Sequence, residues 1–140
     1  MATARNFEEL EVWKASRQLA KNIYLATQGG SFAKDFGLRD QLRRAAVSIV
    51  SNIAEGFERS GNPEFIRFLH MAKGSAGEVR AQLYLALDFK YLPEETFRNL
   101  SECVTIISRQ ISTLITYLEG TRVTRVNRGT AVKQPSTLNL

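Results

Sequence analysis

Apolar residues recur at spacings of three and four in four stretches of this chain, which is the period of an amphipathic helix. These stretches run from about Phe7 to Gln28, from about Asp35 to Arg59, from about Pro63 to Phe89 and from about Pro93 to Glu119. The last has the most regular heptad pattern, formed by Phe97, Leu100, Val104, Ile107, Ile111, Leu114 and Leu118. The pattern predicts four helices, and no strand-like alternation competes with it.

Glycine, asparagine and proline mark the breaks between these helices. GGS at 29–31 ends the first helix, because glycine suits the left-handed conformation beyond a helix terminus. In SGNP at 60–63, we expect Asn62 to cap the third helix and the proline to occupy its first position. Within that helix, Gly74 and Gly77 each cost roughly 1 kcal/mol relative to alanine. We therefore expect another backbone to approach them closely.

Short connections make sequential helices antiparallel neighbours. The predicted fold is all-α, an up-down antiparallel four-helix bundle formed by residues 1–119 as one domain. Residues 120–140 lack a helical seam and are rich in threonine, glycine and asparagine. We expect this tail to be flexible unless a partner orders it.

Composition supports this reading and sets limits on the class of protein. A chain of 140 residues with 44% hydrophobic residues can bury one core without disulfides. One cysteine, Cys103, excludes an internal disulfide and a multi-cysteine zinc site. The N-terminus lacks a secretory apolar region, and no apolar run is long enough for a bilayer. We expect a soluble cytoplasmic protein that makes no membrane contact.

Basic residues dominate the charge, with a net charge of +5. Much of this excess lies in the tail, where residues 120–140 hold four basic residues and no acidic one. Candidate phosphate contacts are Lys14, Arg17 and Lys21 in the first helix, Arg39 and Arg43 in the second, and Arg122, Arg125, Arg128 and Lys133 in the tail. Arginine suits phosphate because its planar fork donates two parallel hydrogen bonds. The competing interpretation is a set of solvated faces with a solubilising tail.

No constellation for catalysis or metal binding is visible in the sequence. His70 is the only histidine and has no second metal ligand at a suitable spacing. Cys103 lies on the flank of the fourth helix's seam, where we expect it to behave as a small hydrophobe. No phosphate-binding glycine loop and no inward-facing pair of carboxylates is apparent. We predict no enzymatic activity, no metal and no cofactor.

A polar stripe accompanies the apolar seam of the second helix. Asn52, Glu55 and Arg59 follow Ser48 along one side of the helical wheel. A buried Asn52 would need a hydrogen-bond partner, and Arg44 could pair with Glu55 of a neighbouring chain. We interpret Arg44, Asn52, Glu55 and Arg59 as structural polar residues or an oligomer interface that sets register. The competing interpretation is an ordinary solvated flank.

Longer motifs add a family resemblance. QLRRAAVSIVSNIAEGFERS at 41–60 and EFIRFLHMAKGSAGEV at 64–79, with FEELEVWKASRQLA and FGLRDQLRRA, resemble a bacterial four-helix bundle family. That family is encoded in intervening sequences of large-subunit ribosomal RNA genes. The resemblance covers residues 7–118 and implies a ring-like homopentamer with no known enzymatic activity. Two departures are Val50, where proline is frequent, and Arg80, where an acidic residue is usual.

A related branch comprises the accessory variability determinant proteins of diversity-generating retroelements. Its members form basic pentameric barrels that bind a reverse transcriptase and nucleic acid, and RVNRG at 125–129 is similar to their basic end. The resemblance therefore implies a non-catalytic, homopentameric accessory protein that binds RNA or DNA and assists a reverse transcriptase. The alternative is a protein-interaction scaffold that docks an acidic partner without nucleic acid.

Overall fold

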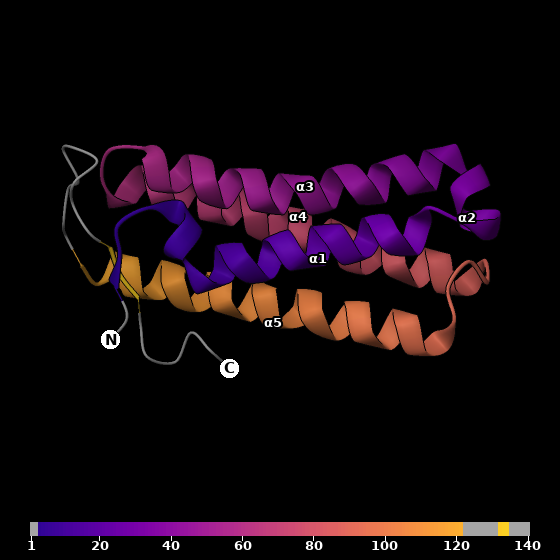
Figure 1. The fold of residues 1–140 in the computed structure, drawn as a ribbon. Coiled ribbons are helices and arrows are strands. Elements are labelled where there is room, and N and C mark those ends of the chain that lie inside the picture. The colour runs from indigo at the N-terminus through magenta and orange to yellow at the C-terminus, as the bar shows by residue number, and fades with distance from the viewer. Residues whose placement is uncertain (1–2, 122–131, 135–140) are drawn as a thin grey trace.

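Four long helices lie side by side and run along one common axis (Figure 1). The computed structural model describes residues 3–121 and 132–134. Its elements are β1 (Thr3–Ala4), the 3-10 helix η1 (Phe7–Glu9), α1 (Glu11–Thr27), α2 (Gly30–Lys34), α3 (Phe36–Glu58), α4 (Asn62–Asp88), α5 (Glu94–Glu119) and β2 (Val132–Lys133). The predicted helical bundle is confirmed, and the short helices α2 and η1 and the two-residue strands β1 and β2 are additions.

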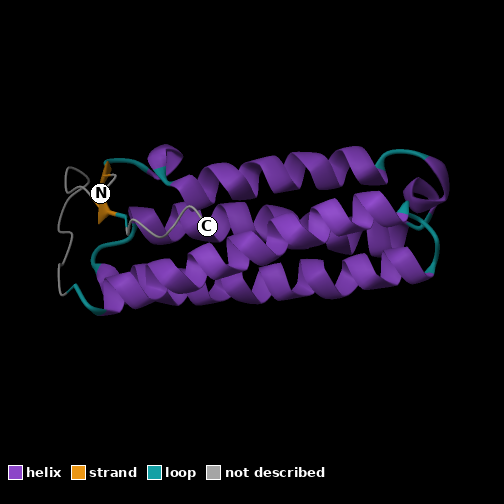
Figure 2. Cartoon of the chain, turned by 90° about the horizontal axis from the view of Figure 1, so that it is seen from below, coloured by secondary structure: helices purple, strands orange, loops and turns teal. Residues whose placement is uncertain are grey.

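The long helices alternate in direction along the chain (Figures 1 and 2). α1 packs against α3 and α5, and α4 packs against the same two helices. α1 and α4 therefore occupy diagonal positions in the bundle. The end that holds β1 and β2 is called the strand end below, and the opposite end, which holds α2, is called the α2 end.

The core follows the predicted seams. In α5, Leu100 to Leu118 of the heptad series are buried and Phe97 is partly buried. In α3, the seam from Leu42 to Phe57 is buried and Leu38 packs against it. No helix of the described residues is long and apolar enough to cross a membrane.

Three helical glycines differ in how closely the rest of the chain packs against them. A Cβ atom on Gly56 would lie 2.7 Å from Phe68 Cβ and 3.3 Å from the Phe65 carbonyl oxygen, so α3 and α4 meet closely there. Around Gly74 and Gly77, by contrast, nothing lies within 4 Å of a built Cβ. The expectation of a close backbone at these two glycines is wrong within this chain, because both lie on the exposed side of α4.

Part of the C-terminal tail returns to the bundle, which the sequence analysis did not predict. β2 pairs antiparallel with β1, with Ala4 opposite Val132. Val132 is 5% exposed and Gln134 is 2% exposed. The Glu11 backbone N–H donates to Gln134 Oε1 at 3.1 Å, so a tail residue caps the start of α1. Figure 2 shows the strands at one end of the bundle.

Asn62 has a different role from the predicted helix cap. Gly61, at φ +83°, precedes α4, and Asn62 is the first helical residue. Its Nδ2 donates to the Leu118 carbonyl oxygen at 3.3 Å and to Thr121 Oγ1 at 3.1 Å. The capping prediction is wrong because the side chain turns toward the end of α5, where it adds a donor to the Leu118 carbonyl oxygen, which also accepts from the Thr121 backbone N–H. Proline at the start of α4 is confirmed.

Candidate nucleic-acid interface

The basic residues predicted in the first helix form an exposed stripe on α1. Lys14, Arg17 and Lys21 are all exposed and recur at spacings of three and four. Lys14 Nζ lies 3.5 Å from Glu11 Oε1, and the Arg17 guanidinium lies 5.6 Å from the centre of the Trp13 ring. Both contacts lie at the surface, so they neutralise the stripe only weakly.

This stripe lies within a segment that has no negative side chains. Between Glu11 and Asp35, the chain contains four basic residues and no acidic residue. The fourth is Lys34, in the last turn of α2. The prediction from the sequence did not include this acid-free run, because a spacing of three and four selects only one face of a helix. The absence of acids makes the local potential more positive than the net charge of the whole chain suggests.

Arg43 connects this stripe to α3. Its Nε donates to Thr27 Oγ1 at 2.8 Å, and its Nη2 donates to the Tyr24 carbonyl oxygen at 3.4 Å. The guanidinium carbon lies 4.4 Å from the centre of the Tyr24 ring. Arg43 forms no ion pair among the described residues. Its positive charge therefore stays unneutralised beside the C-terminal turn of α1, where carbonyl groups favour a cation.

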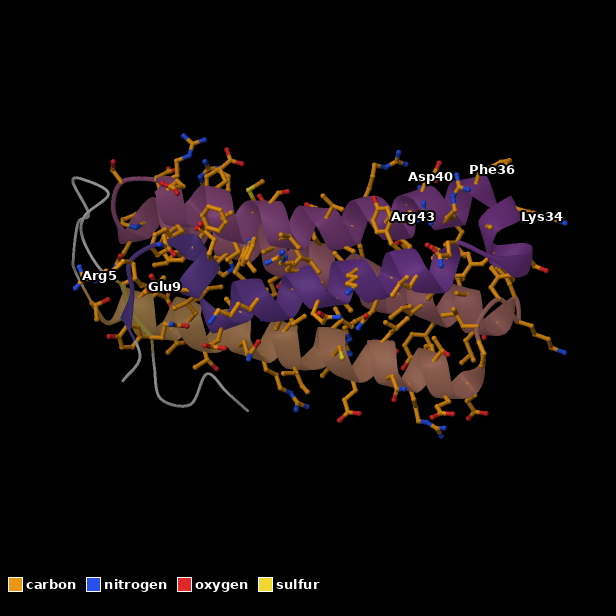
Figure 3. All side chains as sticks on the ribbon, in the orientation of Figure 1. Arg5, Glu9, Lys34, Phe36, Asp40 and Arg43 are labelled. Carbon is orange, nitrogen blue, oxygen red and sulfur yellow. The ribbon has the colours of Figure 1, made fainter. Side chains whose placement is uncertain are left out.

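Arg39 lies one turn earlier on α3 and is more fully engaged. Its Nε lies 2.9 Å from Asp40 Oδ1, and its Nη1 donates to the Ala33 carbonyl oxygen at 3.0 Å. The guanidinium also lies 4.8 Å from the centre of the Phe36 ring. Figure 3 shows Asp40, Phe36 and Arg43 at the α2 end. Asp40 therefore reduces the charge that Arg39 offers to a ligand.

The structure brings together two groups that the sequence suggested separately. Lys14, Arg17 and Lys21 lead along α1 to Tyr24, on which Arg43 of α3 packs, with Arg39 one turn away. We call these five basic residues the basic path. Its α1 part, from Lys14 to the Tyr24 position, extends about 15 Å at the helical rise of 1.5 Å per residue.

The basic path does not include the basic residues of the tail. Arg122, Arg125 and Arg128 lie outside the described residues, so their predicted role stays a prediction. Lys133 lies in β2 through its backbone pairing with Thr3. A tail anchored at residues 132–134 is a different arrangement from the free arm that the sequence suggested.

The predicted interface residue Asn52 finds its partners inside one chain. Its Nδ2 donates to the Ser48 carbonyl oxygen at 2.9 Å and to Ser48 Oγ at 3.0 Å. Ser75 of α4 donates its hydroxyl to the same Ser48 Oγ at 2.9 Å. Asn52 therefore belongs to a polar link between α3 and α4 within one chain. A role in oligomer contacts stays a prediction.

The other three residues of that group are exposed. Arg59 Nη2 lies 2.9 Å from Glu55 Oε1 in the same chain, and the Arg59 guanidinium packs over the Phe68 ring. Arg44 forms no ion pair among the described residues and lines an open pocket of about 310 Å³ with Gln41, Ala45, Ser48 and Glu78. The predicted pairing of Arg44 with Glu55 of a neighbouring chain stays a prediction.

His70 and Cys103 both lie at the surface. The expectation that Cys103 packs as a small hydrophobe is wrong, because its position on α5 is exposed. Among the described residues, no group of three or more histidine, cysteine, aspartate or glutamate side chains could hold a metal ion.

A hydrogen-bonded pair braces the α2 end beside the basic path. Asp35 Oδ1 accepts from the Leu38 backbone N–H at 3.1 Å, and Asp35 Oδ2 accepts from the Tyr91 hydroxyl at 2.8 Å. The bond from Leu38, and then the bond from Tyr91, lowers the pKa of Asp35 below its usual value. The same carboxylate raises the pKa of Tyr91. The pair holds the start of α3 against the connection between α4 and α5.

These features define an all-helical bundle protein with a basic surface. Residues 8–113 match the model of the 23S rRNA-intervening sequence protein family, so the chain belongs to that family. A similar solved structure is the crystal structure of a protein of unknown function from the S23 ribosomal protein family of Bacteroides thetaiotaomicron. The two share 25% identity with a TM-score of 0.69, over 74% of this chain and 97% of that chain.

None of the curated proteins compared with this chain matches it. The resemblance to the intervening-sequence family is thus confirmed, whereas the comparisons give no support to the retroelement branch.

Proposed function

We propose that the protein is a non-catalytic accessory protein that binds the phosphate backbone of nucleic acid through the basic path. The observation that supports this most directly is the position of Arg43. It joins the α3 pair to the α1 stripe without an acidic partner among the described residues. The acid-free segment between Glu11 and Asp35 adds to the same surface.

Binding of this kind depends on charge rather than on base sequence. Each lysine or arginine that neutralises a phosphate releases condensed counterions, so affinity falls steeply as salt increases. Lys14, Arg17 and Lys21 are the best residues to test, because their exposed side chains can change without disturbing the core. Arg43 is a poorer choice, since its hydrogen bonds also hold α3 to α1.

The test compares the wild type with a Lys14→Gln, Arg17→Gln, Lys21→Gln triple variant, using RNA and DNA oligonucleotides over a range of salt concentrations. We expect weaker binding and a slope of log affinity against log salt that is shallower by about 1 for each lost contact. The control is Lys73→Gln with Arg80→Gln, which removes two exposed charges from the diagonal helix α4, and the effects are compared per charge removed.

Equal effects in the triple variant and in the control would contradict a localised path. Absence of wild-type binding at low salt would overturn the proposal. It would favour the second candidate, a scaffold whose basic surface docks an acidic protein.

We also propose that copies of the chain associate, as the resemblance to a homopentamer implies. On α4, Gly74 and Gly77 leave open space beside exposed Met71, and a second chain could approach the backbone there. A ring would repeat the basic path around its axis and so strengthen the local potential. Light scattering after gel filtration tests this, with Gly74→Leu as the blocking variant. A monomer at all concentrations would contradict it.

A narrower form of the proposal is assistance to the reverse transcriptase of a diversity-generating retroelement. It rests on the resemblance of RVNRG at 125–129 to the basic end of that branch. Co-purification with a reverse transcriptase encoded nearby is the test. If no such gene and no stable complex is found, the nucleic-acid proposal stands without this partner.

A further inference from the structure

Two arginine–aromatic stacks lie next to each other on the α2 end. Arg43 packs on Tyr24 and Arg39 packs on Phe36, with guanidinium-to-ring distances of 4.4 Å and 4.8 Å. The two arginines are one helical turn apart on α3, so they lie on one face. We call Tyr24, Phe36, Arg39 and Arg43 the stacking corner.

The side chains of Tyr24 and Phe36 are both exposed to solvent, although large aromatic side chains are usually buried. Tyr24 is 42% exposed, and Phe36, at 64%, is the most exposed large hydrophobic side chain among the described residues. Exposed apolar rings mark an interaction site when they gather on one surface. Figure 3 shows Phe36 and Lys34 at the α2 end, with Arg43 farther along α3.

The arginines are held in place by the fold. Thr27 Oγ1 and the Tyr24 carbonyl oxygen accept from Arg43, while the Ala33 carbonyl oxygen accepts from Arg39. Their planes are therefore ordered before any ligand arrives, which lowers the entropic cost of binding. A structural role, in which the arginines hold α3 to α1 and α2, accounts for their hydrogen bonds. It does not account for the exposure of the Phe36 ring to solvent.

Charge decides which kind of ligand fits this corner. Arg43 forms no ion pair among the described residues, and Lys21 lies one turn from Tyr24 without a polar partner among those residues. An anionic ligand with flat rings is complementary to exposed aromatics beside such cations. Single-stranded nucleic acid has that chemistry, since its bases stack on aromatic or guanidinium planes while its phosphates meet basic side chains.

We propose that the stacking corner binds unpaired bases of single-stranded nucleic acid. This inference rests on the proposed function and narrows its substrate class from any phosphate backbone to single strands. Lys14, Arg17 and Lys21 then contact the phosphates that lead away from the corner. Duplex bases are already stacked on one another, so a duplex gains little from the two rings.

The experiment measures binding of a fluorescent single-stranded oligonucleotide and of a hairpin duplex to the full chain at low and moderate salt. Phe36→Leu and Tyr24→Leu remove one aromatic ring each and keep an apolar side chain; Tyr24→Leu also keeps the backbone carbonyl that binds Arg43. Tyr84→Leu is the matched control, because Tyr84 is 57% exposed and has no arginine over its ring among the described residues. Thermal unfolding checks that all variants fold.

We expect Phe36→Leu and Tyr24→Leu each to weaken single-strand binding by at least about fivefold, the lower end for one stacked base. The salt slope should be unchanged, because no charge is lost, and duplex binding should be unaffected. If both variants bind single strands as the wild type does, the stacking corner is overturned while the phosphate-binding proposal survives. Equal losses in Tyr84→Leu, or on the duplex, also overturn it. If the wild type binds no oligonucleotide, both proposals fail.

Discussion

The two ends of the bundle are closed in different ways. At the strand end, residues far apart in the sequence meet: β1 pairs with β2, Gln134 caps α1, and Asn62 reaches the end of α5. At the α2 end, the polar contacts span shorter separations, such as 16 residues between Arg43 and Thr27 and three residues between Asp35 and Leu38. Tyr91 supplies the main link across a longer separation.

The difference extends to the surface. Of the eight exposed large hydrophobic side chains among the described residues, six lie toward the α2 end: Tyr24, Leu25, Phe36, Tyr84, Leu85 and Phe89. The strand end instead buries Ala4, Leu10 and Val132. Substitutions at the strand end should therefore affect stability, whereas substitutions of Tyr24 and Phe36 in the stacking corner at the α2 end should affect binding.

The largest effect on stability is expected at Gly56, near the strand end. Gly56→Ala forces α3 away from Phe68 and should lower the free energy of unfolding by about 1–3 kcal/mol through overpacking. Gly37→Ala, in the same helix, is the control, because a Cβ there would meet only Asp35 Oδ1 at 3.8 Å and alanine should not destabilise the helix. Urea unfolding of both variants measures the difference. Equal destabilisation by the two would show that Gly56 is not a close contact.

Asn62→Ala should have the next largest effect. The side chain is 6% exposed and donates to the Leu118 carbonyl oxygen and to Thr121 Oγ1, so its loss removes hydrogen bonds that join the start of α4 to the end of α5. We expect a loss of about 1–2 kcal/mol in urea unfolding. Faster amide exchange should accompany it in the last turn of α5. Gln18→Ala, which removes only an exposed bond to Asn22, is the control and should change little.

Gln134→Ala should destabilise the chain by about 1 kcal/mol, because the first turn of α1 loses a side-chain cap. Amide exchange near Glu11 should become faster, while exchange at the α2 end stays the same.

Removing everything after Gly120 should destabilise the chain more than Gln134→Ala does, since Val132 is then lost as well. Substituting the tail arginines one by one therefore tests their role in binding more cleanly than truncation. Unchanged exchange at Glu11 would contradict the cap.

The smallest effect on the free energy of unfolding should come from Tyr91→Phe at the α2 end, and this effect should depend on pH. The lowered pKa of Asp35 means that its stabilisation is present above its unfolded pKa near 3.9 and is lost as pH falls. The raised pKa of Tyr91 means that its stabilisation is present below about pH 10 and is lost as pH rises through the folded pKa.

The wild type should therefore exceed Tyr91→Phe in stability by a margin that is widest near neutral pH and shrinks toward both extremes. Thermal unfolding across the pH range measures it. A margin that does not depend on pH would contradict the pKa shifts that this bond gives to Asp35 and Tyr91.

Much of the helical fold was predictable from the sequence, because helix periodicity is a local property. The α5 heptad and the α3 seam identified the buried faces from spacing alone. The stretches at 41–60 and 64–79 resembled the intervening-sequence family, which the match over residues 8–113 confirms. The basic residues of α1 and α3 were also recognised, but as separate groups.

Local periodicity could not show how those groups meet. Arg43 reaches Thr27 and Tyr24 only because α2 turns the chain so that α3 packs on α1. The sequence predicted Asn62 as a helix cap because a proline follows it, yet its side chain donates to the Leu118 carbonyl oxygen, 56 residues away. The sequence predicted Cys103 to be packed because it adjoins the apolar seam of α5. Its neighbour Val104 is buried, but Cys103 lies one position away on the helix and is exposed.

The sequence by itself determined the four long helices, their apolar faces and the excess of positive charge. Only the tertiary structure decided that the tail returns to cap α1 and that two arginines lie on exposed rings at one corner. The physical reason is the range of the interactions. A helical seam depends on residues three or four apart, whereas the bond between Glu11 and Gln134 joins residues 123 positions apart and forms only once the bundle has brought them together.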